Sequence, residues 1–93
     1  MPLETTKFDI QDYLKTFEQQ AAYIEAALEE NDPAFLAKAL GDVARARGMT
    51  QVARDAGVTR EALYRALSET GDPRLSTFLG VLNSLGFKLR IAA

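Results

Sequence analysis

The hydrophobic residues recur at helical spacing along nearly the whole chain, and glycine, proline and capping residues mark the breaks. Residues 8–14 predict one or two short helical turns. Thr16 is placed to cap a helix over residues 17–30. Steps of three and four residues place one apolar stripe on this helix; its members are Phe17, Ala21, Ile24 and Leu28. We therefore expect this stripe to face the core.

A second helix is predicted immediately after this segment. Asp32 can cap it, and Pro33 suits its first position, where the missing N–H costs nothing. It should run to about Arg47 and end at Gly48. The residues expected to point inward are Leu36, Leu40 and Val43.

A tight pair of helices is predicted next. Residues 51–56 should form a short helix capped by Thr50, and residues 60–67 a second one, with Gly57-Val58-Thr59 turning the chain between them. Two short helices joined by a three- or four-residue turn have the spacing of a helix-turn-helix motif.

The inner positions of this pair match what such packing requires. Ala53 is small where the helices must cross, and Gly57 stands where the turn needs a positive φ. Val58 can fill the angle between the helices, and Leu63 can anchor the second helix to the core. The inner face is completed by Val52, Ala56, Ala66 and Leu67.

The end of the chain predicts a loop, a helix and a strand. Residues 68–73 have turn chemistry. A final amphipathic helix, closed by Gly86, follows; its apolar positions are Leu75, Phe78, Leu79, Leu82 and Leu85. Residues 87–91 alternate apolar and basic side chains with a period of two, which predicts a β-strand. Because it has no partner strand in the chain, we expect it to pair with the same strand of a second copy.

The length and composition set the fold class and exclude much chemistry. Ninety-three residues suit one domain. We expect an all-α, five- to six-helix domain with an acidic helical segment over 1–32, a DNA-binding core over 33–86 and a dimerisation strand over 87–93. The chain has no cysteine and no histidine, which removes disulfides, the usual zinc sites and imidazole or thiol catalysis. We expect no cofactor, no metal site and no enzymatic activity, since adjacent carboxylates such as Glu29 and Glu30 point apart on a helix.

The chain also lacks the features of a membrane or secreted protein. No apolar run approaches the roughly 20 residues of a membrane helix, and residues 1–7 contain no apolar signal region. These features predict a cytoplasmic protein.

Charge is distributed unevenly along the chain. Residues 1–44 hold three lysines and nine carboxylates, a net charge of −6, whereas residues 45–93 hold seven arginines, one lysine and four carboxylates, a net charge of +4. Arginine suits bidentate contacts to phosphate or guanine. The basic half is therefore a candidate DNA-binding face, with a mixed-charge solvated surface as the alternative.

The candidate DNA contacts are the outward residues of the helix pair. In such a motif the first residues of the second helix, and every third or fourth residue after them, face the major groove. Arg60 and Arg65 can reach guanine or phosphate, supported by Tyr64, whereas Gln51 and Thr59 can hold phosphates at helix starts. The complete set is Thr50, Gln51, Thr59, Arg60, Glu61, Tyr64 and Arg65.

Two family resemblances accompany these motifs. Residues 36–86, with the segments 36–48, 49–53, 57–59 and 73–86 as the closest matches, resemble the repressor-type DNA-binding domain of phage repressors. More narrowly, residues 5–14, 23–33 and 39–51 resemble bacterial addiction-module antidote proteins, the antitoxins of toxin–antitoxin operons. The block over 32–51 is the stronger marker of the second family.

The antidote resemblance implies a homodimer that binds a small basic toxin and represses its own operon by binding double-stranded operator DNA. The acidic first half agrees with a cationic partner, although an ordinary solvated helix face also explains it. Two other functions are compatible with the residues: a phage-type regulator without a toxin, and a protein-interaction module that does not bind DNA.

Overall fold

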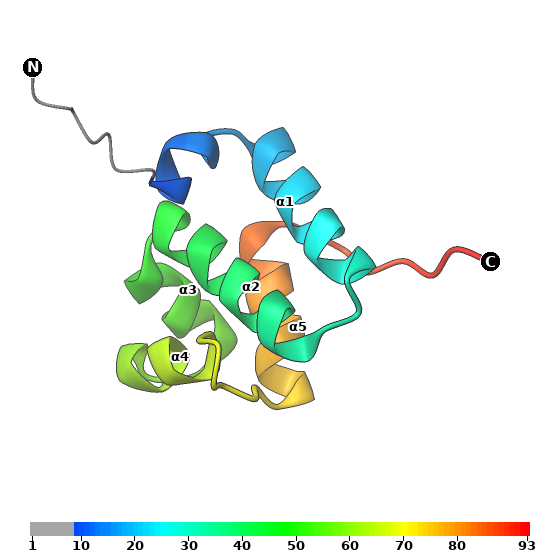
Figure 1. Cartoon of the computed structure of the whole chain (residues 1–93). Coiled ribbons are helices and arrows are strands. Elements are labelled where there is room, and N and C mark those ends of the chain that lie inside the picture. The colour runs from blue at the N-terminus through cyan, green and yellow to red at the C-terminus, as the bar shows by residue number, and fades with distance from the viewer. Residues whose placement is uncertain (1–8) are drawn as a thin grey trace, which may run out of the picture.

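The computed structural model describes residues 9–93, and over this range every regular element is a helix, which confirms the predicted all-α class (Figure 1). The elements are η1 (Ile10–Tyr13), α1 (Phe17–Glu29), α2 (Pro33–Arg47), α3 (Met49–Ala56), α4 (Arg60–Ala66) and α5 (Leu75–Leu85). Phe8 and the residues before it, which begin the predicted N-terminal turns and the 5–14 resemblance, lie outside the described residues. None of the helices over residues 9–93 is long and apolar enough to cross a membrane.

The predicted caps of α1 and α2 are confirmed. The Thr16 hydroxyl accepts a hydrogen bond from the Gln19 N–H at 3.0 Å, and the Gln19 side chain accepts one from the Thr16 N–H, which completes a capping box. The Asp32 carboxylate accepts from the first-turn N–H of Ala34, and Pro33 occupies the first helical position. These local signals are sufficient to set both helix starts.

The predicted start of α3 is wrong. The helix begins at Met49, so Thr50 lies inside its first turn and does not cap it. Gly48 is the N-cap at φ +121°, a backbone conformation that side chains of other residues rarely adopt. Gly48 is both the C-cap of α2 and the N-cap of α3, so it alone separates the two helices, and no side chain caps α3.

The turn between α3 and α4 has the predicted geometry. Gly57 is left-handed at φ +75°, and the N–H of Val58 donates to the Ala53 carbonyl at 3.0 Å. Thr59 caps α4 by accepting from the Ala62 N–H at 3.0 Å. Leu63 of α4 is fully buried, and together with these hydrogen bonds it fixes α4 against α3.

One hydrophobic core holds all the helices together. The largest fully buried side chains come from α2, from α4 and its C-cap, and from α5; they are Leu40, Leu63, Leu67, Leu85, Val43 and Val81. Leu14 before α1, and Ile24 and Ala27 on α1, join the same cluster. The first half of the chain is therefore part of the packing that supports α3 and α4.

The predicted apolar stripes of α1 and α5 are only partly buried. Phe17 and Leu28 at the ends of the α1 stripe are exposed, as are Leu79 and, at 70% exposure, Leu75 on α5. Periodicity identifies the apolar face correctly, but the neighbouring helices cover only part of it. The uncovered parts remain as apolar surface.

The predicted C-terminal strand is not found, which corrects the expectation for residues 87–91. Over residues 9–93 the structure contains no strand to supply ladder hydrogen bonds, so the tail leaves α5 as an irregular segment (Figure 1). Phe87 instead packs against Phe17 of α1, with ring centroids 4.9 Å apart. Beyond this contact the side chains of the tail are exposed.

Candidate nucleic-acid interface

A surface hollow collects four of the predicted contact residues from two helices. Thr50 and Gln51 reach it from α3, and Arg60 and Tyr64 from α4. The other lining residues are Arg45, Gly48 and Met49. The hollow therefore combines two guanidinium groups with the start of α3, where no side chain caps the helix.

Arg60 and Tyr64 form a pair on the outer face of α4. The Arg60 guanidinium carbon lies 5.6 Å from the centre of the Tyr64 ring, and its Nη2 donates to the Tyr64 hydroxyl at 3.4 Å. This hydrogen bond raises the pKa of Arg60, whose guanidinium carries its positive charge at every physiological pH as arginines do. The contact uses one of the five N–H groups of the guanidinium and leaves the others for an acceptor.

Gln51 is held by a bridge between α3 and α5. Its side-chain Nε2 donates to Asp55 Oδ1 at 2.9 Å, and the Ser84 hydroxyl donates to Asp55 Oδ2 at 2.7 Å. The hydrogen bond from Ser84, followed by that from Gln51, lowers the pKa of Asp55. Asp55 therefore stays ionised and keeps the Gln51 side chain in place at the rim of the hollow.

The remaining predicted residues are exposed but do not line the hollow. Thr59 uses its hydroxyl oxygen to cap α4 and keeps its O–H as a donor. Glu61 and Arg65 lie on the exposed surface of α4 outside the hollow. The structure thus gathers Thr50, Gln51, Arg60 and Tyr64 without Thr59, Glu61 and Arg65.

Arg45 lines the hollow and was not among the predicted contacts. It lies in the last turn of α2, and its Nη2 donates to Asp42 at 2.8 Å. Arg45 stands three residues before Gly48, the N-cap of α3. This position could have indicated in the sequence that Arg45 lies beside the start of α3, because α2 ends there.

Arg47 does not contribute to the candidate interface, although it belongs to the basic half of the chain. Its Nε donates to Gln20 Oε1 at 2.8 Å, and its Nη2 donates to the Leu85 carbonyl. It therefore joins α1 to the end of α5. The basic half includes at least one arginine that serves the packing of the helices.

Asp42 of α2 forms a buried polar centre that the sequence pattern did not reveal. The residue is 3% exposed, and its carboxylate accepts from Tyr23 at 2.5 Å, from Arg45 at 2.8 Å and from Lys38 at 3.4 Å. Gln11 of η1 donates to its backbone carbonyl at 2.9 Å. Asp42 thus connects α1 to α2 through its carboxylate and η1 to α2 through its backbone carbonyl.

From its contact with Asp42 we expect Tyr23 to ionise at a higher pH than an exposed tyrosine. Burial, then the hydrogen bond to Asp42 and its negative charge, raise the pKa of Tyr23 from 10.0 to about 12. Because the folded pKa exceeds the unfolded one, the associated stability is complete below pH 10 and is lost as the pH rises towards 12. In a tyrosinate absorbance titration, we expect a step near pH 12 that Tyr23→Phe removes.

The control for this titration is the wild-type protein in concentrated urea, where the step should return towards pH 10. If Tyr23 ionises near pH 10 in the folded protein, the contact with Asp42 is absent.

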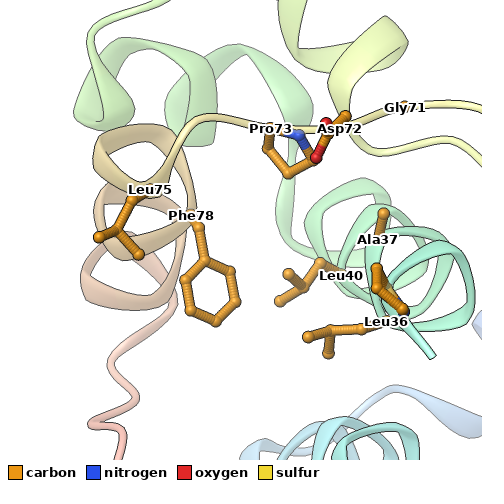
Figure 2. A pocket seen from close by; sticks show the side chains of 9 residues that line it. Leu36, Ala37, Leu40, Gly71, Asp72, Pro73, Leu75 and Phe78 are labelled. Atoms are coloured by element: carbon orange, nitrogen blue, oxygen red, sulfur yellow. The ribbon is translucent and has the colours of Figure 1, made fainter. Parts of the chain in front are cut away.

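An apolar cavity of about 270 Å³ lies between α2 and the start of α5, away from this hollow. Figure 2 shows Leu36 and Leu40 of α2 pointing towards Phe78 of α5, with Asp72 and Pro73 of the preceding loop beside them. Among the described residues that line it, only Asp72 is charged, and no two of them form a pair suited to acid–base or nucleophilic chemistry.

Comparison with known proteins assigns the chain to a family. Residues 4–93 match the model of a family described as "probable addiction module antidote protein". The chain is also 42% identical over 84 residues to an uncharacterized protein of Haemophilus influenzae, a match that covers 90% of this chain and 87% of that protein. No solved structure matches the chain. The chain belongs to the addiction-module antidote family, and membership implies a toxin as its partner.

Proposed function

We propose that this protein is the antitoxin of a toxin–antitoxin operon. It neutralises a small basic toxin by direct binding, and as a homodimer it represses its own operon through α3 and α4, which act as a helix-turn-helix motif. Membership of the antidote family supports the first role. The observation that carries the second is the hollow where side chains from α3 and α4 meet Arg45.

The DNA-binding proposal assigns different roles to the two helices. We assign α4 to the major groove, where Arg60, Tyr64 and Arg65 on its exposed surface face the base edges. The start of α3 then faces the phosphate backbone, because its uncapped first-turn N–H groups and the helix dipole favour an anion. Arg45 and Gln51 beside this start supply further donors. These contacts position the protein, whereas those of α4 select the sequence.

The toxin-binding proposal relies on the acidic surface of the first half. Among the described carboxylates of this half, only Asp42 is buried. The others are exposed; they are Asp9, Asp12, Glu18, Glu25, Glu29, Glu30 and Asp32. An exposed surface of one charge sign speeds and selects the encounter with a partner of the opposite sign. A basic toxin fits this surface.

Charge reversal tests the toxin proposal better than truncation does. Removing residues 1–30, the simplest test from the sequence, would take Leu14, Ile24 and Ala27 out of the core. Asp12→Lys with Glu18→Lys changes two exposed residues instead and leaves the core intact. We expect this variant to capture the basic protein encoded beside its gene at least about tenfold more weakly, while operator binding is unchanged.

The matched control is Glu69→Lys with Asp72→Lys, which changes the net charge equally in the loop before α5. It should capture the toxin normally. Wild-type protein should also restore growth to cells that express the neighbouring gene. Absence of both rescue and capture contradicts the antitoxin role, whereas full capture by the Asp12 and Glu18 variant contradicts only the assigned surface.

A further inference from the structure

A groove runs between α1 and the C-terminal tail on the side of the molecule away from the candidate DNA interface. Its floor is apolar and includes Ile24 and Leu28 of α1 and Leu82 of α5. Glu25 and Glu29 of α1 stand along it as acidic residues. Lys88 and Arg90 of the chain's own tail also line the groove. The α1 side of the groove therefore offers an apolar strip beside two negative charges, and the tail side carries two positive charges.

The chain's own tail borders this groove without filling it. The N–H of Phe87 donates to the Leu82 carbonyl at 2.9 Å, and the Phe87 ring rests on Phe17, so the tail begins as one wall of the groove. The wall continues through Lys88, Leu89, Arg90 and Ala92, and the end of the tail extends past α1 (Figure 1). The apolar side chains of the tail are only loosely covered, with Leu89 52% and Ile91 95% exposed.

The tail and the groove carry complementary features. In an extended segment, alternate side chains point to opposite sides, so Leu89 and Ile91 share one side and Lys88 and Arg90 the other. The two ion pairs among residues 9–93 both use Asp42. Glu25 and Glu29, like the two basic residues of the tail, thus make no ion pair within this range.

We propose that two copies of this chain exchange their tails, each tail lying in the α1 groove of the other copy. Leu89 and Ile91 then cover the apolar floor, and Lys88 and Arg90 approach Glu25 and Glu29. Because the same chain supplies both partners, two-fold symmetry makes each contact twice. The inference rests on the homodimer of the proposed function and identifies the surface through which the two copies meet. The contact is made by side chains and needs no β-strand.

Charge swapping between two variants tests the exchange. The groove variant carries Glu25→Lys and Glu29→Lys, and the tail variant carries Lys88→Glu and Arg90→Glu. Within either variant, groove and tail have the same charge sign, so we expect the dimer dissociation constant to rise at least about tenfold. In an equal mixture, both contacts of a mixed dimer are again of opposite sign, so the mixture should dimerise.

Sedimentation velocity at low salt and micromolar concentration, with one variant fluorescently labelled, measures this directly. Glu69→Lys with Asp72→Lys is the control and should dimerise as the wild type does. Unchanged helical circular dichroism and melting temperature establish that each variant is folded; if the double variants unfold, the single variants Glu29→Lys and Arg90→Glu repeat the pairing test.

Two outcomes overturn the exchange. If both variants still form dimers on their own, the interface lies elsewhere and the homodimer stands. If the variants are monomeric both alone and in the mixture, the tail does not engage the partner's groove. A monomeric wild type overturns the exchange and the homodimer together, but toxin capture and growth rescue still test the antitoxin role. If the groove variant dimerises yet loses toxin capture, the groove holds the toxin and not the tail.

Discussion

Arg60→Ala and Arg65→Ala should each weaken operator binding by about 1–3 kcal/mol, a factor of roughly 5 to 150, and relax the preference at one base pair. Both arginines are exposed on α4, and Tyr64 orients Arg60 through its ring and hydroxyl. A guanidinium that meets guanine O6 and N7 discriminates between bases, so its loss should affect operator DNA more than scrambled DNA. Titrating both DNAs with each variant measures this ratio.

Arg45→Ala provides the contrasting result. If Arg45 contacts a phosphate, its removal should weaken binding to operator and scrambled DNA alike and reduce the salt slope by about 1. Arg54→Ala, an exposed arginine of α3 that does not line the hollow, is the matched control and should bind as the wild type does. If folded Arg60→Ala and Arg65→Ala proteins both keep the wild-type ratio, the bases are read by another part of the protein.

Gly41→Ala should destabilise the protein by about 1–3 kcal/mol, even though alanine favours a helix interior by roughly 1 kcal/mol over glycine. Gly41 is buried in α2, where an added Cβ would overlap the Leu67 carbonyl oxygen and lie 3.3 Å from the Leu67 Cβ. That carbonyl belongs to the C-cap of α4, so a rigid backbone group has to move. The clash therefore outweighs the gain in helix propensity.

Thermal unfolding measures this effect, since 1 kcal/mol corresponds to roughly 4–8 °C in a domain of this size. Asn83→Ala on α5, exposed and likewise helical, is the control and should change stability by no more than about 0.5 kcal/mol. A Gly41→Ala protein as stable as the wild type would mean that α2 and the end of α4 do not approach each other closely. In that case α2 would not support the position of α4.

The features that the sequence predicted correctly depend on neighbouring residues. Thr16, Asp32 and Gly57 act through hydrogen bonds or dihedral angles within a few positions, so their spacing was sufficient to place helix ends. The same reasoning failed at Thr50, because the positive φ of Gly48 allowed α3 to begin at Met49, two residues earlier than a helix capped by Thr50 would. A local pattern cannot show which of two nearby residues turns the chain.

The features that the sequence missed depend on residues distant in the chain. Asp42 is one of nine carboxylates in the first half and became a buried centre only because Tyr23 and Gln11 pack over it. Arg45 and Arg47 have similar sequence surroundings, yet one lines the hollow and the other joins α1 to α5. Helical spacing gives the direction of a side chain but not the element that meets it.

The same limit applies to exposed apolar residues. The period of the α5 stripe predicted that Leu75 faces the core, but no neighbouring helix covers the first turn of α5 on that side, and Leu75 remains exposed. The period of two over residues 87–91 predicted a strand, but a strand also needs a second strand beside it. Both errors arise because periodicity contains no information about the partner surface.

A gel-shift titration with the DNA upstream of this protein's own gene tests the central claim most directly. The proposed repressor should retard this DNA at moderate salt with a dissociation constant in the range of about 10⁻⁸–10⁻¹¹ M. It should bind scrambled DNA of the same length with a dissociation constant at least about a thousandfold higher. Equal retardation of both DNAs, or none of the upstream DNA up to about 10 μM protein, would contradict the assignment of α3 and α4 as an operator-binding motif.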